Sequence, residues 1–247
     1  MDIFTALILG TVQGLTEFLP VSSSGHLVLG RYLLTSYKEP GVVFEAFLHA
    51  GTLFAILYYF RKEIFKLSKK YVFYIILATL PAALFGYLFS PFFEGLFESP
   101  RLVGFALLAT GFLNLMTDLK VDTKRKLNYK NSIMIGFFQA LAIIPGISRS
   151  GSTIFAGTRA GIKRENAAKF SFLLSVPAVL GANVLQFAKY GVSLEANAAN
   201  YLVGFIFAFV AGYFAINTVI KVLKEKKFKY FAYYCFLVGI TTLLVAG

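Results

Sequence analysis

The chain has 247 residues, of which 57% are hydrophobic and only 15% are charged. A soluble domain carries about 25% charged residues and rarely exceeds about 50% apolar ones, so this composition excludes an ordinary soluble domain and indicates a polytopic membrane protein. The 24 basic residues outnumber the 12 acidic ones. They form short clusters between apolar runs, which is typical of membrane topology and does not favour a nucleic-acid partner. The single cysteine, Cys235, excludes an internal disulfide and a cysteine-based zinc site.

Six apolar runs are long enough to cross about 30 Å of hydrocarbon, which takes roughly 20 helical residues. We predict membrane spans over residues 42–60, 71–90, 101–119, 168–188, 199–220 and 229–246. Of the 24 basic residues, 19 lie in four connecting segments, residues 61–70, 120–130, 159–169 and 221–229. The positive-inside rule places these segments in the cytoplasm, so we expect both chain termini on the outer side.

Two further apolar runs, residues 3–19 and 133–147, end in turn-forming residues. The first contains Gln13 and Glu17 and is followed by Pro-Val-Ser-Ser-Ser-Gly at residues 20–25, and the second is followed by Ser-Arg-Ser-Gly at residues 148–151. A short helical stretch comes after each break. The basic connecting segments all fall on one side of the membrane only if each of these helix pairs enters and leaves the membrane on the same side. We therefore predict two re-entrant hairpins. A signal peptide is the alternative for the first run, but Asp2 replaces the basic start of such a peptide.

The two hairpins resemble each other at an offset of 126 positions. The identical pairs are Gly10 and Gly136, Gln13 and Gln139, Leu15 and Leu141, Ser22 and Ser148, Ser24 and Ser150, and Gly25 and Gly151. The sequence predicts one all-α integral membrane domain over residues 1–247, with repeat halves over 1–120 and 127–247. Each half is a re-entrant helical hairpin followed by three transmembrane helices. Because three spans reverse the side of the membrane, the repeat is an inverted-topology one.

Ionisable residues at membrane depth each cost on the order of 3 kcal/mol and are candidates for function. They are Glu17, His26, Glu45, His49 and Arg149. Gln13 and Glu17 share one helix face. The short helices at the two tips begin with serines and free N–H groups, which attract anions, and Arg149 carries a planar donor fork suited to phosphate. The sequence therefore predicts a phosphate-binding site where the two hairpin tips meet.

A structural role is the alternative for each of these residues. The serines at 22–24 can serve only to satisfy the backbone of a polar tip. Arg149 can serve only as the ion-pair partner of Glu17 across the repeat. For Glu45 and His49 we favour a structural role, because the predicted span places them at its outer end, near water.

Residues 13–26, QGLTEFLPVSSSGH, resemble the bacterial undecaprenyl-diphosphatase family, also called bacitracin-resistance proteins. The E/Q-x-x-x-E motif of that family falls on Gln13 and Glu17. Its P-G-x-S-R-S-x-x-T motif falls on Pro145, Gly146, Ser148, Arg149, Ser150 and Thr153. The resemblance covers essentially the whole chain. It implies an all-helical, often homodimeric enzyme of the bacterial plasma (inner) membrane, with a site open to the outer face, that removes the terminal phosphate of undecaprenyl diphosphate and recycles this lipid carrier for cell-wall synthesis.

Phosphoryl transfer needs an in-line nucleophile and neutralisation of the charge on the phosphoryl oxygens. We expect Ser23 to attack, activated by His26 or Glu17, and attack by His26 itself is the alternative. The three-residue spacing brings Ser23 and His26 within reach of a hydrogen bond. Arg149 supplies the positive charge. We expect the substrate to be bound by Gln13, Ser22, Ser24, Gly25, Ser148, Ser150 and Thr153.

The glutamine at position 13 leaves the first motif with one carboxylate, which argues against a tightly held two-carboxylate metal site. A loosely bound Mg²⁺ or Ca²⁺ shared by Glu17 and the diphosphate fits the preference of hard cations for oxygen ligands. We expect no organic cofactor. A transporter or flippase of a phosphorylated polyprenyl lipid is the rival function, because broken helices that meet at the midplane are its usual signature.

Overall fold

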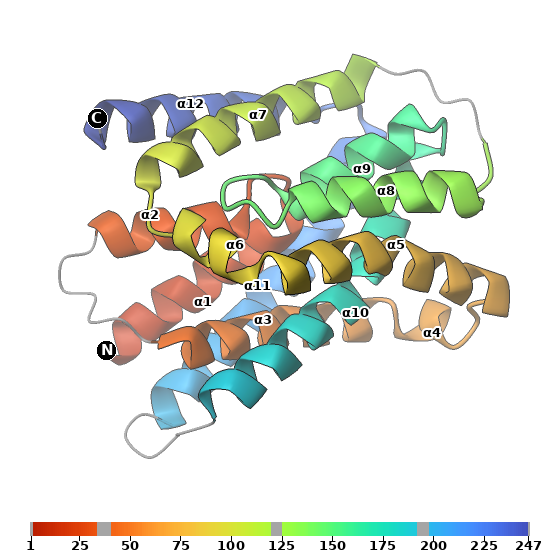
Figure 1. Ribbon diagram of the computed structural model, residues 1–247. Helices are drawn as coiled ribbons and strands as arrows, with labels where there is room; N and C mark the ends of the chain where they lie inside the picture. Colours follow the sequence, from red (N-terminus) through yellow and green to blue (C-terminus); the bar gives the residue numbers. More distant parts are fainter. Residues whose placement is uncertain (1, 34–40, 120–124, 192–197, 247) are drawn as a thin grey trace.

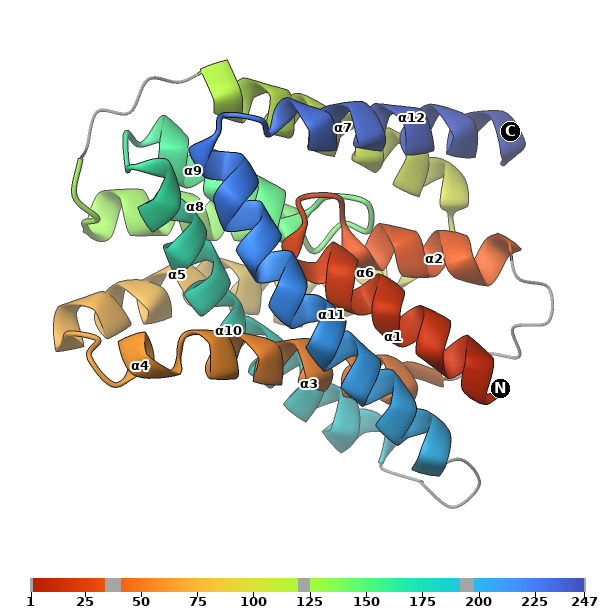
Figure 2. The ribbon, with the colours of Figure 1, turned by 180° about the vertical axis from the view of Figure 1, so that it is seen from behind.

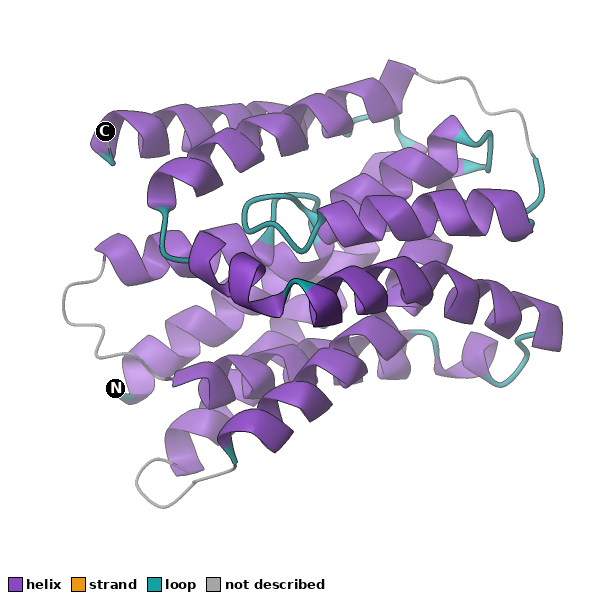
Figure 3. Cartoon of the chain, in the orientation of Figure 1, coloured by secondary structure: helices purple, strands orange, loops and turns teal. Residues whose placement is uncertain are grey.

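The computed structural model describes residues 2–33, 41–119, 125–191 and 198–246, and the regular elements in these ranges are helices (Figure 3). In chain order they are α1 (Ile3–Phe18), α2 (Ser23–Leu33), α3 (Gly41–Tyr59), α4 (Arg61–Ile64), α5 (Lys69–Leu88), α6 (Ser90–Leu96), α7 (Pro100–Leu119), α8 (Tyr129–Leu141), α9 (Arg149–Arg159), α10 (Arg164–Tyr190), α11 (Ala198–Lys224) and α12 (Lys229–Val245). The predicted all-helical fold is confirmed.

Each of the six predicted spans coincides with one helix, in order α3, α5, α7, α10, α11 and α12. By length and composition, α5, α7, α10 and α11 are able to cross a membrane, whereas α12 and Val43–Tyr59 of α3 are shorter apolar helices. Large apolar side chains such as Phe54, Phe112 and Leu185 are exposed on the outside of the bundle. Water would penalise so much exposed apolar surface, whereas lipid does not. The chain is a multi-pass membrane protein.

The helix pairs α1–α2 and α8–α9 form the two predicted hairpins. The α1–α2 pair reaches the middle of the molecule from the end where α1 begins and α12 ends, and the α8–α9 pair reaches it from the opposite end (Figures 1 and 2). Helix α1 ends at Phe18, two residues before Pro20, and α8 ends at Leu141, four residues before Pro145. Proline lacks the N–H that a helix needs, so both breaks follow from the sequence. The loops at residues 19–22 and 142–148 therefore meet at the centre.

The basic segments between the spans gather at the end of the bundle opposite the start of α1. Helix α4, the beginning of α8 and the turn between α9 and α10 all lie there (Figure 1). Residues 120–124 of the second basic segment and Lys38 of an outer connection lie outside the described residues. This arrangement is the one that a positive-inside topology requires of the described segments.

Packing between the two halves follows the 126-residue offset. Helix α1 packs against α11, and α8 packs against α5. A Cβ on Gly10 would meet the carbonyl oxygen of Gly204, and a Cβ on Gly136 would meet that of Ala78. Gly136 lies 126 positions after Gly10, and Gly204 lies 126 positions after Ala78, so the two contacts are equivalent under the offset. The packing agrees with an inverted repeat, which stays a prediction together with the division into halves 1–120 and 127–247.

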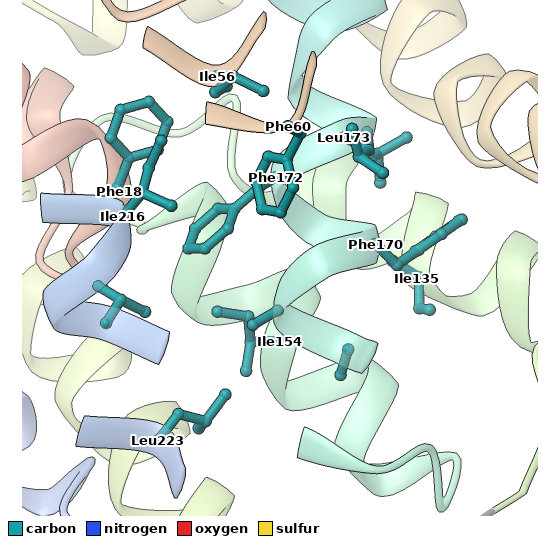
Figure 4. Close-up of a cluster of buried hydrophobic side chains, with 14 of the residues drawn as sticks. Phe18, Ile56, Phe60, Ile135, Ile154, Phe170, Phe172, Leu173, Ile216 and Leu223 are labelled. Atoms are coloured by element: carbon teal, nitrogen blue, oxygen red, sulfur yellow. The ribbon is translucent and has the colours of Figure 1, made fainter. Parts of the chain in front are cut away.

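The largest cluster of buried apolar side chains ties both hairpins to the long helices (Figure 4). Phe18 at the end of α1 packs edge-on against Phe172 of α10, with ring centroids 5.7 Å apart. Ile154 of α9 and Ile216 of α11 belong to the same buried cluster. Glu17 and Ser171 are the chain neighbours of this aromatic pair, so the packing of the core fixes where their polar groups lie.

Candidate active site

The two hairpin tips approach each other at Gly25 and Gly146. A Cβ on Gly25 would lie 3.1 Å from the Cα of Gly146. Gly146 has a φ of 95°, a backbone conformation that side chains disfavour. Ser150 Oγ at the second tip donates a hydrogen bond of 3.2 Å to the carbonyl of Leu19 at the first. The tips thus form one unit.

Helix α7 holds both tips through two buried side chains one turn apart. Thr110 Oγ1 donates to the Gly146 carbonyl at 2.8 Å and accepts from the Ser148 N–H at 3.0 Å. Asn114 Nδ2 donates to the Pro20 carbonyl at 2.6 Å. Irregular backbone in a membrane must be satisfied by the protein itself, and these bonds provide that.

The carboxylate of Glu17 joins the two tips chemically. Its side chain is 7% exposed. Oε2 accepts hydrogen bonds from Ser23 Oγ at 2.7 Å and from Gln13 Nε2 at 3.0 Å. Oε1 accepts a charge-assisted bond from Nη2 of Arg149, which begins the helix of the opposite tip. A hydroxyl, a carboxylate and a guanidinium therefore lie in direct contact.

The predicted hydrogen bond between Ser23 and His26 is replaced by another arrangement. Ser23 Oγ donates to Glu17, while the His26 ring turns the other way: Nδ1 lies 2.7 Å from the Ser22 carbonyl and Nε2 lies 2.7 Å from the Tyr234 hydroxyl. Both ring nitrogens of His26 are occupied by these partners. Of the two predicted activators of Ser23, Glu17 is the one in contact with it.

The position of His49 differs from the expectation of a water-facing span end. Its Nε2 lies 3.9 Å from Glu17 Oε2, and its side chain is 26% exposed. Its Nδ1 donates to the Glu45 carbonyl one turn back at 2.8 Å, because a carbonyl can only accept. The reason is tertiary: α3 packs against α1, so the polar face of α3 turns toward Glu17. His49 is therefore a member of the site.

Arg149 pairs with Glu17 and also donates from Nη1 to the Ser171 carbonyl at 3.5 Å. Its side chain is 15% exposed. Thr153 lies one turn behind it and is buried; its hydroxyl lies 2.6 Å from Ser171 Oγ and donates to the Arg149 carbonyl at 2.8 Å. The Thr153 hydroxyl is thus engaged in holding the helix that carries Arg149.

The predicted serines cap the two short helices in matching ways. Ser22 Oγ accepts from the Gly25 N–H at 3.3 Å, and Ser148 Oγ accepts from the Gly151 N–H at 3.1 Å. Each capping hydroxyl also lies 3.2 Å from the serine two residues on, Ser24 or Ser150. Two helix N-termini therefore converge on the region of Arg149, and their partial positive charge favours an anion.

The donor set fits a cation that arrives with phosphates better than a resident ion. Across the described residues, no group of three or more His, Cys, Asp and Glu side chains is arranged to hold a metal. Both Glu17 oxygens already accept hydrogen bonds. The buried Oε1 of Gln13 has no hydrogen-bond partner among the described residues, and it is an oxygen of the kind that hard cations bind.

The chain matches the family model described as bacitracin resistance protein BacA over residues 6–241. The chain belongs to this family. It is 42% identical to the undecaprenyl-diphosphatase of Halothermothrix orenii, over 100% of this chain and 99% of that protein. It is 43% identical to undecaprenyl-diphosphatase 4 of Bacillus thuringiensis strain Al Hakam and 41% identical to the undecaprenyl-diphosphatase of Methanobrevibacter smithii, in both cases over 97% of this chain and 96% of the relative.

Sequence reasoning missed three side chains around the site of this bacitracin resistance family member, Thr110, Asn114 and Tyr234. It named His49 as a candidate but favoured a structural role for it. A signal existed for the pair on α7, since Thr110 and Asn114 are polar residues one turn apart within an apolar span. Tyr234 gives no such signal, because tyrosine is common throughout the interfacial regions of membrane helices.

Proposed function

We propose that the chain is an undecaprenyl-diphosphatase, which hydrolyses undecaprenyl diphosphate to undecaprenyl phosphate and inorganic phosphate and so recycles the lipid carrier of cell-wall synthesis. The observation that carries this proposal is the Glu17 carboxylate, which accepts hydrogen bonds from Ser23 at one tip and from Arg149 at the other. A base, a hydroxyl and a guanidinium in contact are the parts that phosphoryl transfer requires. The names of the three relatives support the substrate.

Ser23, Glu17 and Arg149 take separate roles in the proposed reaction. Ser23 Oγ attacks the terminal phosphorus, its proton passes to Glu17, and the bridging P–O bond breaks, so that undecaprenyl phosphate leaves. Arg149 exchanges its bond to Glu17 for bonds to the phosphoryl oxygens, where its fork grips two oxygens at once. After Glu17 has passed its proton to solvent, it activates a water that attacks the phosphoserine, which releases inorganic phosphate and restores Ser23.

Attack by His26 is the alternative, and it gives a phosphohistidine in place of the phosphoserine. The two intermediates differ in acid stability, so trapping with ³²P-labelled substrate distinguishes them. The hydrogen bond of Ser23 to Glu17 favours the serine. Our predicted phosphate-binding set stays Gln13, Ser22, Ser24, Gly25, Ser148, Ser150 and Thr153.

A divalent cation such as Mg²⁺ or Ca²⁺ would be held by Glu17, by the Oε1 of Gln13 and by the diphosphate itself. Bound there, it would supply charge neutralisation for the phosphates. Because the protein offers a single carboxylate, we expect weak binding without substrate.

The polyprenyl tail needs an apolar path that begins beside Ser23. A groove of about 270 Å³ runs between α2 and α12, and its lining includes Leu29, Leu237, Val238 and Val245. The same two helices carry His26 and Tyr234, which stack with ring centroids 5.6 Å apart. We propose that this groove takes the first isoprene units of the tail.

The tail groove is tested with a matched pair of substitutions on α12. Leu237 lines the groove, whereas Leu244 on the same helix is 79% exposed and does not line it. Leu237→Trp should raise KM for a C55 diphosphate several-fold while leaving KM for a short-chain diphosphate unchanged, and Leu244→Trp should change neither. Equal effects on both chain lengths would contradict the placement of the tail.

The orientation follows from the basic segments, which we propose lie in the cytoplasm, with the site open to the outer face of the plasma membrane. The buried Cys235 is the chain's one cysteine. Labelling of a cysteine substituted for Lys126 therefore shows on which side of the membrane residue 126 lies. Reaction of that cysteine with an impermeant reagent in intact cells would contradict this orientation. We also propose a homodimer, which the mass of the detergent-solubilised protein tests.

The activity itself is tested by phosphate release from a C55 diphosphate with purified protein in detergent. Release without any membrane compartment supports the phosphatase and not the rival transporter or flippase, since transport needs two compartments. No release from pure, folded protein would overturn the proposed function.

A further inference from the structure

Ser22, immediately before Ser23, has a left-handed backbone. Its φ is 70°, and among the described residues only Lys226 shares this feature without being a glycine. Left-handed φ is uncommon for residues with a side chain and persists where neighbours hold it. The peptide unit between Ser22 and Ser23 therefore needs a partner to keep it in place.

His26 supplies that partner. The Ser22 carbonyl accepts two hydrogen bonds from His26, one from the backbone N–H at 3.2 Å and one from the ring Nδ1 at 2.7 Å. Because a carbonyl can only accept, Nδ1 carries the ring proton. In the neutral ring Nε2 then accepts from the Tyr234 hydroxyl, 2.7 Å away. The tautomer that the Ser22 carbonyl requires thus has a hydrogen-bond partner at each ring nitrogen, and the bond from Tyr234 holds the ring in this orientation.

We infer that His26 and Tyr234 are positioning residues, which hold Ser22 in its left-handed conformation and so keep the Ser23 hydroxyl on Glu17. The inference rests on the proposed function, because it assigns Ser23 as the attacking group. In this arrangement the two ring nitrogens of His26 are bonded to Ser22 and Tyr234, while Ser23 Oγ donates to Glu17. Its influence on the reaction passes through the backbone.

The second tip lacks this arrangement of a left-handed serine and a histidine bonded to it. There the left-handed position is Gly146, and Ser148, the counterpart of Ser22, has an ordinary φ of −70°. The counterpart of His26 is Ser152, which is buried and whose Oγ has no hydrogen-bond partner among the described residues. A histidine bonded to its own preceding turn is not by itself unusual, since His49 does the same in the middle of α3. The left-handed Ser22 and the second bond to Tyr234 distinguish His26.

The decisive experiment compares asparagine and glutamine at position 26. An asparagine amide lies near the place of Nδ1 and keeps a donor for the Ser22 carbonyl, whereas a glutamine amide reaches toward the place of Nε2. We expect His26→Asn to keep kcat within about tenfold of the wild type, because it exchanges one neutral hydrogen bond for a similar one. His26→Gln should lower kcat by about a hundredfold, the cost of a misplaced reacting group. KM should change little in both.

Tyr234 is tested by the loss of its hydroxyl. Tyr234→Phe should lower kcat about three- to tenfold at unchanged KM. Tyr233→Phe, at an exposed neighbouring position, is the matched control and should have no effect. In the His26→Asn background Nε2 no longer exists, so adding Tyr234→Phe should cost nothing further, a non-additivity that a purely structural role of Tyr234 would not produce.

Wild-type phosphate release reports on the proposed function alone, and its loss in Ser23→Ala reports on the assignment of the nucleophile. The relative kcat values of His26→Asn and His26→Gln report on the positioning role. An active His26→Gln beside an inactive His26→Asn would overturn the inference, because Nε2 would then serve the chemistry. Equal and complete loss in both variants with the protein folded would overturn it as well. So would additive effects of Tyr234→Phe and His26→Asn.

Discussion

The first hairpin tip carries Ser22, Ser23 and Ser24, and the second carries Ser148, Arg149 and Ser150, so the two tips share their outer serines and differ at the central position. The first serine of each tip, Ser22 or Ser148, does the same work in both places, since each caps its helix through the N–H of the glycine three residues on. The capping geometry therefore aims position 23 and position 149 at a common point between the tips. What differs is the chemistry presented there, a hydroxyl from one tip and a guanidinium from the other.

The common point is Glu17, and it has no counterpart in the second hairpin, where Ile143 stands at the equivalent position. One carboxylate thus serves both tips, as acceptor for Ser23 and as counter-ion for Arg149. The comparison teaches that two tips with the same capping geometry form an asymmetric site when their central residues differ. The following substitutions test the separate roles in order of expected effect.

Ser23→Ala removes the attacking hydroxyl and should lower turnover on the order of 10⁴-fold or more. The matched control is Ser152→Ala in the second hairpin, a buried serine whose hydroxyl has no partner among the described residues, and it should stay near wild-type activity. Phosphate release and trapped ³²P-phosphoprotein are the measurements. Near-normal turnover of Ser23→Ala would show that Ser23 is not the nucleophile.

Glu17→Gln should lower turnover by about 10²- to 10⁴-fold across the whole pH range, because an amide cannot take the proton of Ser23. Excess chelator should reduce the wild-type rate if Glu17 also shares a divalent cation with the diphosphate. The thermal unfolding of the variant serves as its control, since Arg149 loses its counter-ion. Turnover that responds to neither treatment would leave Glu17 as a structural partner of Arg149 only.

The sequence was sufficient to predict the features that depend on local pattern. The span helices follow from the length of apolar runs, the hairpin breaks follow from Pro20 and Pro145, and the contact residues Glu17, Ser23 and Arg149 lie in contiguous motifs. The missed features depend on packing between distant segments. The direction of the His26 ring is determined by Tyr234, 208 positions later, and His49 reaches Glu17 only because α3 packs beside α1.

Arg149→Lys tests whether the second tip supplies a phosphate clamp or only a counter-ion. A lysine keeps the charge but offers one point of contact where the guanidinium grips two oxygens, so the rate should fall roughly a hundredfold. If Arg149 only neutralised Glu17, lysine would largely replace it, and the double variant Glu17→Gln with Arg149→Gln would fold and remain active. A nearly active lysine variant would therefore remove the clamp from the mechanism.

The smallest expected effects concern the left-handed residue of each tip, and stability is the measurement. Ser22→Gly suits a φ of 70° and loses only the capping hydroxyl, so it should cost about a few tenths of a kcal/mol. Gly146→Ala should cost about 1–3 kcal/mol, because its φ is 95° and the new Cβ would lie 2.7 Å from Ala106 Cβ and from the Val103 carbonyl oxygen. Thermal unfolding in detergent compares the two. Equal losses of stability would mean that the second tip has room to relax around the new methyl group. A larger loss in Gly146→Ala means that only the first tip tolerates a change at its left-handed residue, because His26 restrains the backbone there.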